Sequence, residues 1–157
     1  VTPDASLALL WTLDLLPPSD ARIVSTMKEL MQTLHVRTPI GGYARFTNDY
    51  YQFDGKPSKD VPGNPWIITT LRFAQWQIAT AKSLEDLQKP LELLRWAQKA
   101  ASPAGLLPEQ LHPWSGKPLS VAPLTWSHAV DVEAFLQFLD KEAELQGKLS
   151  CPLPPLQ

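Results

Sequence analysis

The chain has 157 residues, a formal net charge of -2 and 44% hydrophobic residues, enough apolar material for one domain with a substantial core. This charge balance offers no basic surface for nucleic acid and no polybasic segment for a membrane. No apolar run approaches the roughly 18 residues of a membrane-spanning helix, and no signal peptide is recognisable. We expect a soluble protein, cytoplasmic rather than secreted, although a mature secreted chain would look the same.

Metal, disulfide and cofactor chemistry find no support in the sequence. Cys151 is the single cysteine and lies close to the C-terminus. Three histidines, His35, His112 and His128, are scattered and bracket no cysteine or acidic residue at a metal-binding spacing. We expect no metal ion and no cofactor. We interpret Cys151 as an incidental thiol, and His112 and His128 as structural residues.

Two helices are predicted in the first 35 residues, on either side of Pro17-Pro18. Apolar residues recur every three or four positions over residues 5–16 and again over 19–35, as on one face of a helix. Proline ends the first segment, and Ser19-Asp20 is suited to open the second. Because the connection between them is short, we expect the two helices to be antiparallel neighbours.

A third and a fourth helix are predicted after a long connection. Residues 36–64 have no helical period and are rich in proline, glycine and aromatic residues. We expect the third helix to start at Asn64-Pro65, with asparagine as its N-cap, and to be buried on most sides. Ser83 and Asp86 resemble a capping box for the fourth helix, in which Pro90 is expected to cause a kink or a break.

A fifth helix is predicted over residues 123–145, after a second proline-rich connection at 102–122. Residues 1–146 then form one helical domain, and 147–157 form a proline-rich tail. The side chains of the fifth helix that we expect to face the core are Trp126, Val130, Phe135, Leu136 and Leu139.

The lengths of the connections predict where the loops gather. If consecutive helices are antiparallel, the two short connections lie at one end of the array, and the two long ones, 36–64 and 102–122, meet at the other. One arginine, a few carboxylates and several aromatic residues are thereby expected on one face. The candidates there are Arg45, Asp49, Tyr50, Tyr51, Trp66, Glu109, His112, Trp114 and Trp126.

Such a face suits a carbohydrate. Flat aromatic rings stack on the C–H faces of a pyranose, while isolated polar groups bind its hydroxyls. Hydrolysis of a glycosidic bond requires two carboxyl groups, one acting as acid and the other as base or nucleophile. Glu109 is the single carboxylate of the second long connection and is our candidate for a catalytic base.

Four short motifs follow one another along the chain. They are Arg45–Tyr50 (RFTNDY), Gly63–Ile67 (GNPWI), Leu107–Gln110 (LPEQ) and Leu124–Ala129 (LTWSHA). In content, order and spacing they resemble the C-terminal part of glucoamylase-type glycoside hydrolases of family 15, and the resemblance covers roughly residues 4–140. It implies an all-α fold, an (α/α)6 barrel of inner and outer helices with its active site where the long loops gather. It also implies inverting hydrolysis of α-linked glucans or oligosaccharides, with Glu109 as the general base.

The resemblance also implies a set of substrate-binding residues. Arg45 matches a substrate-binding arginine, with a structural salt bridge to Asp49 as the alternative. Trp66 and Trp126 match aromatic residues of the sugar subsites, with core packing as the alternative. Asp49 and Tyr51 are further substrate-binding candidates, although Tyr51, like its neighbour Tyr50, is equally suited to anchoring the loop. We interpret Trp114 as loop packing.

One departure from the family pattern has a large consequence. An (α/α)6 barrel needs six helix pairs, and about five helices are predicted here. The family's general acid lies upstream of the matched region, so no residue of this chain corresponds to it. Alone, the chain is expected to be an incomplete, inactive portion of the barrel, with inner-helix surface exposed along the missing seam. An N-terminal half or a second copy is the partner expected to cover that seam.

Two other functions remain open at this stage. One is a non-catalytic carbohydrate-binding or regulatory module that resembles the barrel of the phosphorylase kinase large subunit. The other is a helical interaction domain that binds a partner through the exposed seam. The intact Pro108-Glu109-Gln110 sequence favours the hydrolase.

Overall fold

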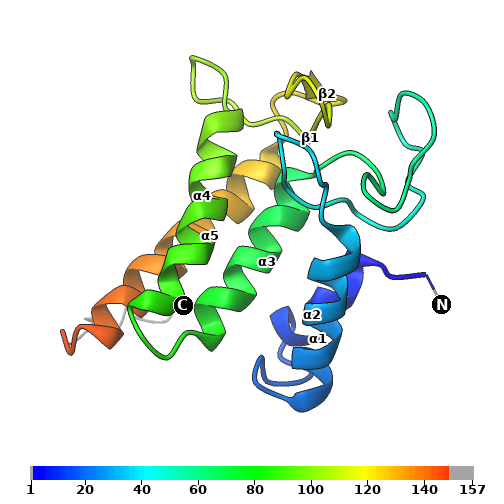
Figure 1. Cartoon of the computed structure of the whole chain (residues 1–157). Helices are drawn as coiled ribbons and strands as arrows, with labels where there is room; N and C mark the ends of the chain where they lie inside the picture. The colour runs from blue at the N-terminus through cyan, green and yellow to red at the C-terminus, as the bar shows by residue number, and fades with distance from the viewer. Residues whose placement is uncertain (1, 149–157) are drawn as a thin grey trace.

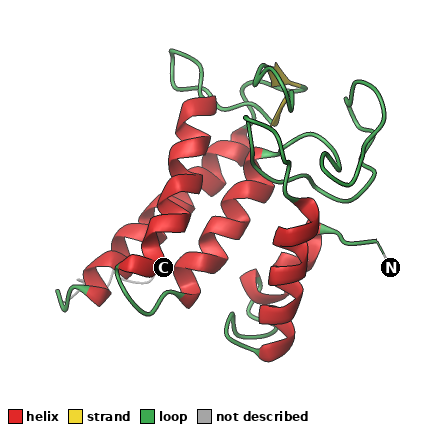
Figure 2. Ribbon diagram, viewed as in Figure 1, coloured by secondary structure: helices red, strands yellow, loops and turns green. Residues whose placement is uncertain are grey.

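The computed structural model describes residues 2–148, so residues 149–157 of the predicted tail, with Cys151, lie outside the described residues. The fold is all-α, as predicted, apart from one short hairpin (Figures 1 and 2). None of the described helices is long and apolar enough to cross a membrane. The elements are the 3-10 helix η1 (Ala5–Ala8), α1 (Leu9–Thr12), α2 (Ala21–Leu34), α3 (Ile67–Thr80), the 3-10 helix η2 (Glu85–Leu87), α4 (Gln88–Ala100), β1 (Gln110–Leu111), β2 (Pro118–Leu119) and α5 (Thr125–Leu145).

Helix α3 lies at the centre of the array and is buried on most sides, as its apolar circumference predicts. One hydrophobic cluster joins α3 to α4 and α5 through Leu71, Leu94 and Val130. A second cluster joins α3 to α2 and η1–α1 through Phe73 and Met27. The two clusters lie on opposite sides of α3. This helix therefore connects α4 and α5 on one side with α2 and η1–α1 on the other.

The first and third helices differ from the prediction in where they start and end. The first is a 3-10 turn followed by a four-residue α-helix that ends at Thr12, because the chain turns at Asp14 (φ 55°) before it reaches Pro17. Aspartate tolerates this left-handed backbone better than most residues. Helix α3 begins at Ile67 without a side-chain cap, so the prediction of Asn64 as N-cap was wrong.

A capping box lies at the start of η2, the turn that leads into α4. The Ser83 hydroxyl accepts a hydrogen bond from the Asp86 amide, and the Asp86 carboxylate accepts one from the Ser83 amide. Pro90 lies in the first turn of α4, where its missing N–H costs no hydrogen bond. This is why α4 continues through Pro90 without a break.

The two long connections meet at the same end of the helix array, as predicted (Figure 1). A bridge pairs Trp66 with Gln110, and the Ile67 amide donates to the Glu109 carbonyl at 3.1 Å. Within the second connection, β1 and β2 form an antiparallel hairpin that the sequence did not suggest. Its strands are only two residues long, too short for an alternating pattern to be recognised.

Helix α5 presents an apolar face that no described element covers. Of the five residues predicted to face inward, only Val130 does; the buried face is Ser127, Val130, Ala134 and Phe138. The other four are between 43% (Leu139) and 58% (Trp126) exposed. Together with Val132 they line the open side of α5. Between α4 and α5 this side is hollowed into a groove of about 390 Å³, which includes Leu91 and Phe135. This uncovered face of α5 is the part of the described chain that fits the predicted seam.

Among the glycines of the first long connection, Gly42 has the least room for a side chain. Its φ is +80°, and a Cβ there would lie 2.6 Å from the Trp96 ring and 2.9 Å from Pro65. Gly41 has a similar φ of +71° and open space around it. Alanine at either position carries a left-handed backbone cost of about 1–2 kcal/mol. Since overpacking costs about 1–3 kcal/mol, Gly42→Ala should lower the free energy of unfolding in urea by that much more than Gly41→Ala. Equal losses would contradict the close approach of Trp96.

Candidate active site

Arg45 and Asp49 form a bidentate ion pair at the loop end of the helices. Arg45 Nε and Nη2 each donate to one carboxylate oxygen at 3.0 Å, and Asp49 also accepts from the Tyr51 amide. Asp49 is buried, whereas Arg45 is partly exposed. Within the described part of the chain, Arg45 Nη1 has no hydrogen-bond partner. Asp49 therefore holds the guanidinium in place and leaves one edge of it available to a ligand.

Aromatic rings surround the Arg45 guanidinium. Its Cζ lies 4.6 Å from the centroid of Trp66, 4.7 Å from Phe46 and 5.4 Å from Tyr51. The Tyr51 and Trp66 rings are themselves 6.1 Å apart. These distances are within the range of cation–π attraction, which helps to keep the charged group in a largely apolar setting.

Glu109 lies on the loop before β1, beside the start of α3. Its backbone is tied to Ile67 and Val121, and its partly buried carboxylate accepts a hydrogen bond from the Gln110 side-chain amide at 3.2 Å. The start of α5 supports the same loop, because Ser127 donates to the Pro108 carbonyl and His128 Nε2 accepts from the Leu107 amide. His128 thus has a structural contact, as expected.

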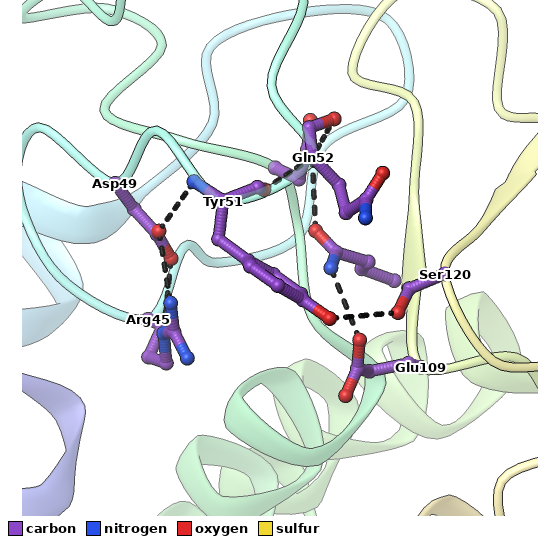
Figure 3. Close-up of polar contacts among 8 residues, drawn as sticks. Arg45, Asp49, Tyr51, Gln52, Glu109 and Ser120 are labelled. Carbon is purple, nitrogen blue, oxygen red and sulfur yellow. Dashed lines mark hydrogen bonds and ion pairs between the residues drawn. The ribbon is translucent and has the colours of Figure 1, made fainter.

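Tyr51 connects the two halves of the site. Its hydroxyl lies 3.3 Å from Ser120 Oγ, at the end of the β1–β2 hairpin. Figure 3 shows the Glu109 side chain on the Ser120 side of the Tyr51 ring, with Arg45 and Asp49 on the other side. The ring therefore lies between the carboxylate and the guanidinium.

Strained backbone is concentrated around this group. Four non-glycine residues among those described have positive φ, and three of them, Asn48, Gln52 and Ser120, adjoin the site at 56–61°. Each such conformation costs about 1–3 kcal/mol and persists only when its surroundings impose it. Such positions are commonly found at functional sites, so their clustering here supports a functional role for this end of the molecule.

A cavity of about 380 Å³ opens beside Arg45 and is bounded by the starts of η1, α3 and α5. Arg45, Phe46, Trp66 and Trp126 line it, and Asp4 and Arg72 add polar groups. The wall is largely apolar with a few polar side chains, which is the usual character of a small-molecule site. Glu109 does not line this cavity. Trp66 does, and its backbone pairs with Gln110, the residue after Glu109, so the carboxylate lies next to the cavity.

The structure brings together most of the residues expected at this end. Arg45, Asp49, Tyr51 and Trp66 form one cluster, Glu109 adjoins it, and Trp126 lines the adjacent cavity. Trp114 instead packs against Phe53 and His112, as a loop residue. The main chain at Trp114 and Ser115 donates to His112 Nδ1, which gives that histidine a structural contact too. Tyr50 points to solvent.

Sequence reasoning missed Arg72 and Ser120. Arg72 lines the cavity and is held by Gln75 and Glu133 at 2.9 and 3.2 Å. It is the one charged residue of α3, which was a usable signal in an otherwise uncharged helix. Ser120 had no such signal, because only its left-handed backbone and its contact with Tyr51 distinguish it. Within residues 2–148 no group of three or more His, Cys, Asp or Glu side chains is arranged to hold a metal ion.

No family model matches the chain, but two curated proteins are similar to it in sequence. An uncharacterised glycosyl hydrolase of Methanocaldococcus jannaschii is 32% identical over 133 residues, which are 79% of this chain and 20% of that protein. A glucoamylase of a Clostridium species is 30% identical over 140 residues, 84% of this chain and 19% of that enzyme. The chain therefore spans about a fifth of the length of the curated relatives it matches.

The crystal structure of a bacterial glucoamylase complexed with acarbose has the same fold over the matched region. It superposes with a TM-score of 0.71 at 21% identity, over 96% of this chain and 23% of the enzyme. In sequence, the chain is similar to part of a glycosyl hydrolase and part of a glucoamylase. In fold, it is glucoamylase-like and corresponds to one part of an (α/α)6 barrel.

Proposed function

We propose that this chain carries the base-bearing part of an inverting α-glucosidase site, with Glu109 as the general base. The observation that supports this best is the position of Glu109 at the same end of the array as Arg45, Tyr51 and Trp66, held by the start of α3. In an inverting reaction, the base takes a proton from the water that attacks the anomeric carbon. A second carboxyl group protonates the leaving oxygen, and the glycosidic bond breaks.

Among the residues that the structure describes, the arginines of the cavity leave no unpaired positive charge for an anionic ligand. Each arginine that lines the cavity is paired with a carboxylate, Arg45 with Asp49 and Arg72 with Glu133. Paired arginines still present N–H donors, and sugar hydroxyls are good acceptors for them. Trp66, Trp126 and Tyr51 are our candidates for stacking on pyranose rings. The proposed substrate is an α-linked glucan or oligosaccharide, and Asp49 acts on it indirectly by holding Arg45.

The general acid is proposed to come from another part of the barrel. Within residues 2–148 the carboxylate of Glu109 has a hydrogen bond only with the Gln110 side chain, and inverting enzymes hold their two carboxyl groups roughly 6.5–9.5 Å apart. The apolar side of α5 and the α4–α5 groove are the surfaces against which further helices of such a barrel would pack. An N-terminal half is our proposed occupant, and self-association is the alternative outcome.

The stereochemistry of the product tests this function. A protein that joins this chain to the rest of the barrel should hydrolyse maltose, and proton NMR should show β-glucose as the first-formed anomer. Initial release of α-glucose would contradict inversion. The 157-residue chain should itself bind acarbose, the ligand of the related bacterial glucoamylase, with a change in tryptophan fluorescence that Trp66→Phe diminishes. Binding by the joined protein without any hydrolysis would favour the carbohydrate-binding alternative.

A further inference from the structure

Asn64 is a buried amide at the point where the two long connections meet. It is 1% exposed, and its Nδ2 lies within hydrogen-bond distance of three oxygen atoms. Two are the main-chain carbonyls of Tyr51 and Gln52, at 3.3 and 3.0 Å. The third is Gln110 Oε1, at 2.8 Å.

The polarity of these contacts determines the orientation of two side chains. Main-chain carbonyls can only accept, so the Asn64 atom that faces them must be its NH2 group. That group can only donate, so Gln110 must turn its oxygen toward Asn64. Gln110 Nε2 then faces the other way and donates to Glu109 Oε2 at 3.2 Å. Because Gln110 is fully buried, water offers it no alternative partner.

We infer that Asn64 is a positioning residue for catalysis. It orients the Gln110 amide, which in turn holds one oxygen of Glu109 and leaves the other to face water. The same NH2 group also holds the loop that carries Tyr51. Asn64 therefore fixes the position of the Glu109 carboxylate relative to the Tyr51 ring. This inference rests on the proposed function of Glu109.

We call the hydrogen bonds from Asn64 through Gln110 to Glu109 the relay. Asn64→Asp tests it, because aspartate has the shape of asparagine but replaces the donating NH2 group with an acceptor. The new carboxylate accepts rather than donates, so Gln110 should rotate and present its oxygen to Glu109, which repels the base. In the joined barrel protein we expect kcat on maltose to fall about 10- to 100-fold, the scale of a misplaced catalytic group. Gln110→Met removes the contact with Glu109 and the one with Asn64, but leaves Asn64 its two main-chain carbonyls, so kcat should fall by a similar factor while KM stays within about threefold. If KM rises and kcat is unchanged in Gln110→Met, the relay is wrong.

The double variant decides whether Asn64 acts through Gln110. In the Gln110→Met background, Asn64→Asp should lower kcat by a clearly smaller factor than it does alone, because residues that act as a unit are not additive and only its hold on the Tyr51 loop remains to be lost. Losses that simply multiply would overturn the inference. If Asn64→Asp does not fold, Asn64→Ser takes its place, since a hydroxyl keeps one donor and should lose less activity.

A second readout does not depend on activity. In the 157-residue chain, the side-chain amide resonances of Gln110 should move in both Asn64→Asp and Glu109→Gln. Unmoved Gln110 resonances in Asn64→Asp would refute the relay even if Glu109 is the base. Unchanged turnover in Glu109→Gln would instead refute the proposed function and leave the relay intact.

Trp76→Phe provides the matched control. It removes one partly buried hydrogen bond, from Trp76 Nε1 to the Pro18 carbonyl at 3.1 Å, at the end of the array where the short connections lie. Because Trp76 is also a buried core residue, the variant should cost more stability than the roughly 1 kcal/mol of one hydrogen bond, and it should leave kcat and the Gln110 resonances unchanged.

Discussion

Replacement of Glu109 by glutamine is expected to lower maltose hydrolysis by the joined barrel protein about 10²- to 10⁴-fold, the range that general-base catalysis supplies. Glutamine matches the size of glutamate and keeps a hydrogen-bonding oxygen for Gln110, but it cannot take a proton from the attacking water. Binding of acarbose should persist, since the side chain still occupies the same space. The measurement is the rate of glucose release at saturating maltose, together with the acarbose Kd from fluorescence.

Two further variants sharpen this result. Glu144→Gln changes an exposed carboxylate near the C-terminal end of α5, far along the chain from the site, and should leave the rate unchanged. Glu109→Ala opens a space in which azide can attack the anomeric carbon directly, without a base. We expect azide to restore turnover with β-glucosyl azide as the product. Full activity of Glu109→Gln would remove the proposed mechanism.

Replacement of Asp49 by alanine should give the second large effect. Asp49 is buried and accepts three hydrogen bonds, two from Arg45 and one from the Tyr51 amide. Loss of a charged acceptor leaves these donors without a partner, at a cost of about 2–3 kcal/mol in the free energy of unfolding. Arg45 would also lose its orientation, so we expect acarbose affinity to fall at least about tenfold. Urea denaturation and fluorescence titration measure the two effects separately.

The pair of Arg37 with Asp60 offers a control with the same residue types. Its atoms are 3.7 Å apart and the Asp60 side chain is 73% exposed. Exposed pairs of this kind contribute less than about 1 kcal/mol, so Asp60→Ala should have a small effect on unfolding and none on acarbose binding. A loss of binding in Asp60→Ala equal to that in Asp49→Ala would mean that the ion pair with Arg45 has no specific role.

Local chemistry determined much of what the sequence predicts correctly. Asp20 caps α2 by accepting from the Arg22 amide, and Ser83 with Asp86 forms the capping box before α4. Both follow from hydrogen bonds over two or three residues, which a sequence contains in full. The meeting of the two long connections also followed, because connection lengths and antiparallel neighbours leave few arrangements.

The errors occur where one side chain has two possible partners. Asn64 has the chemistry of an N-cap, yet α3 begins three residues later at Ile67, and Asn64 bonds instead to the carbonyls of Tyr51 and Gln52 and to Gln110. The capping interaction would be local, whereas the bonds it makes instead reach across 12, 13 and 46 residues of chain. The ion pair of Asp49 with Arg45 was one of the two alternatives that the sequence left open, and the tertiary structure contains it.

The sequence by itself determined the helices, the end at which the loops meet and the acid on the second loop, because periodicity, caps and connection lengths are local properties. Only the tertiary structure decided which face of α5 is buried, since Val130 and Leu136 are equally apolar and α3 is present on one side alone. It also decided that Tyr51 lies between Arg45 and Glu109, and that Asn64 orients Gln110. Those placements depend on contacts between residues distant in the chain, where packing and hydrogen-bond polarity decide among partners that are chemically equivalent in the sequence.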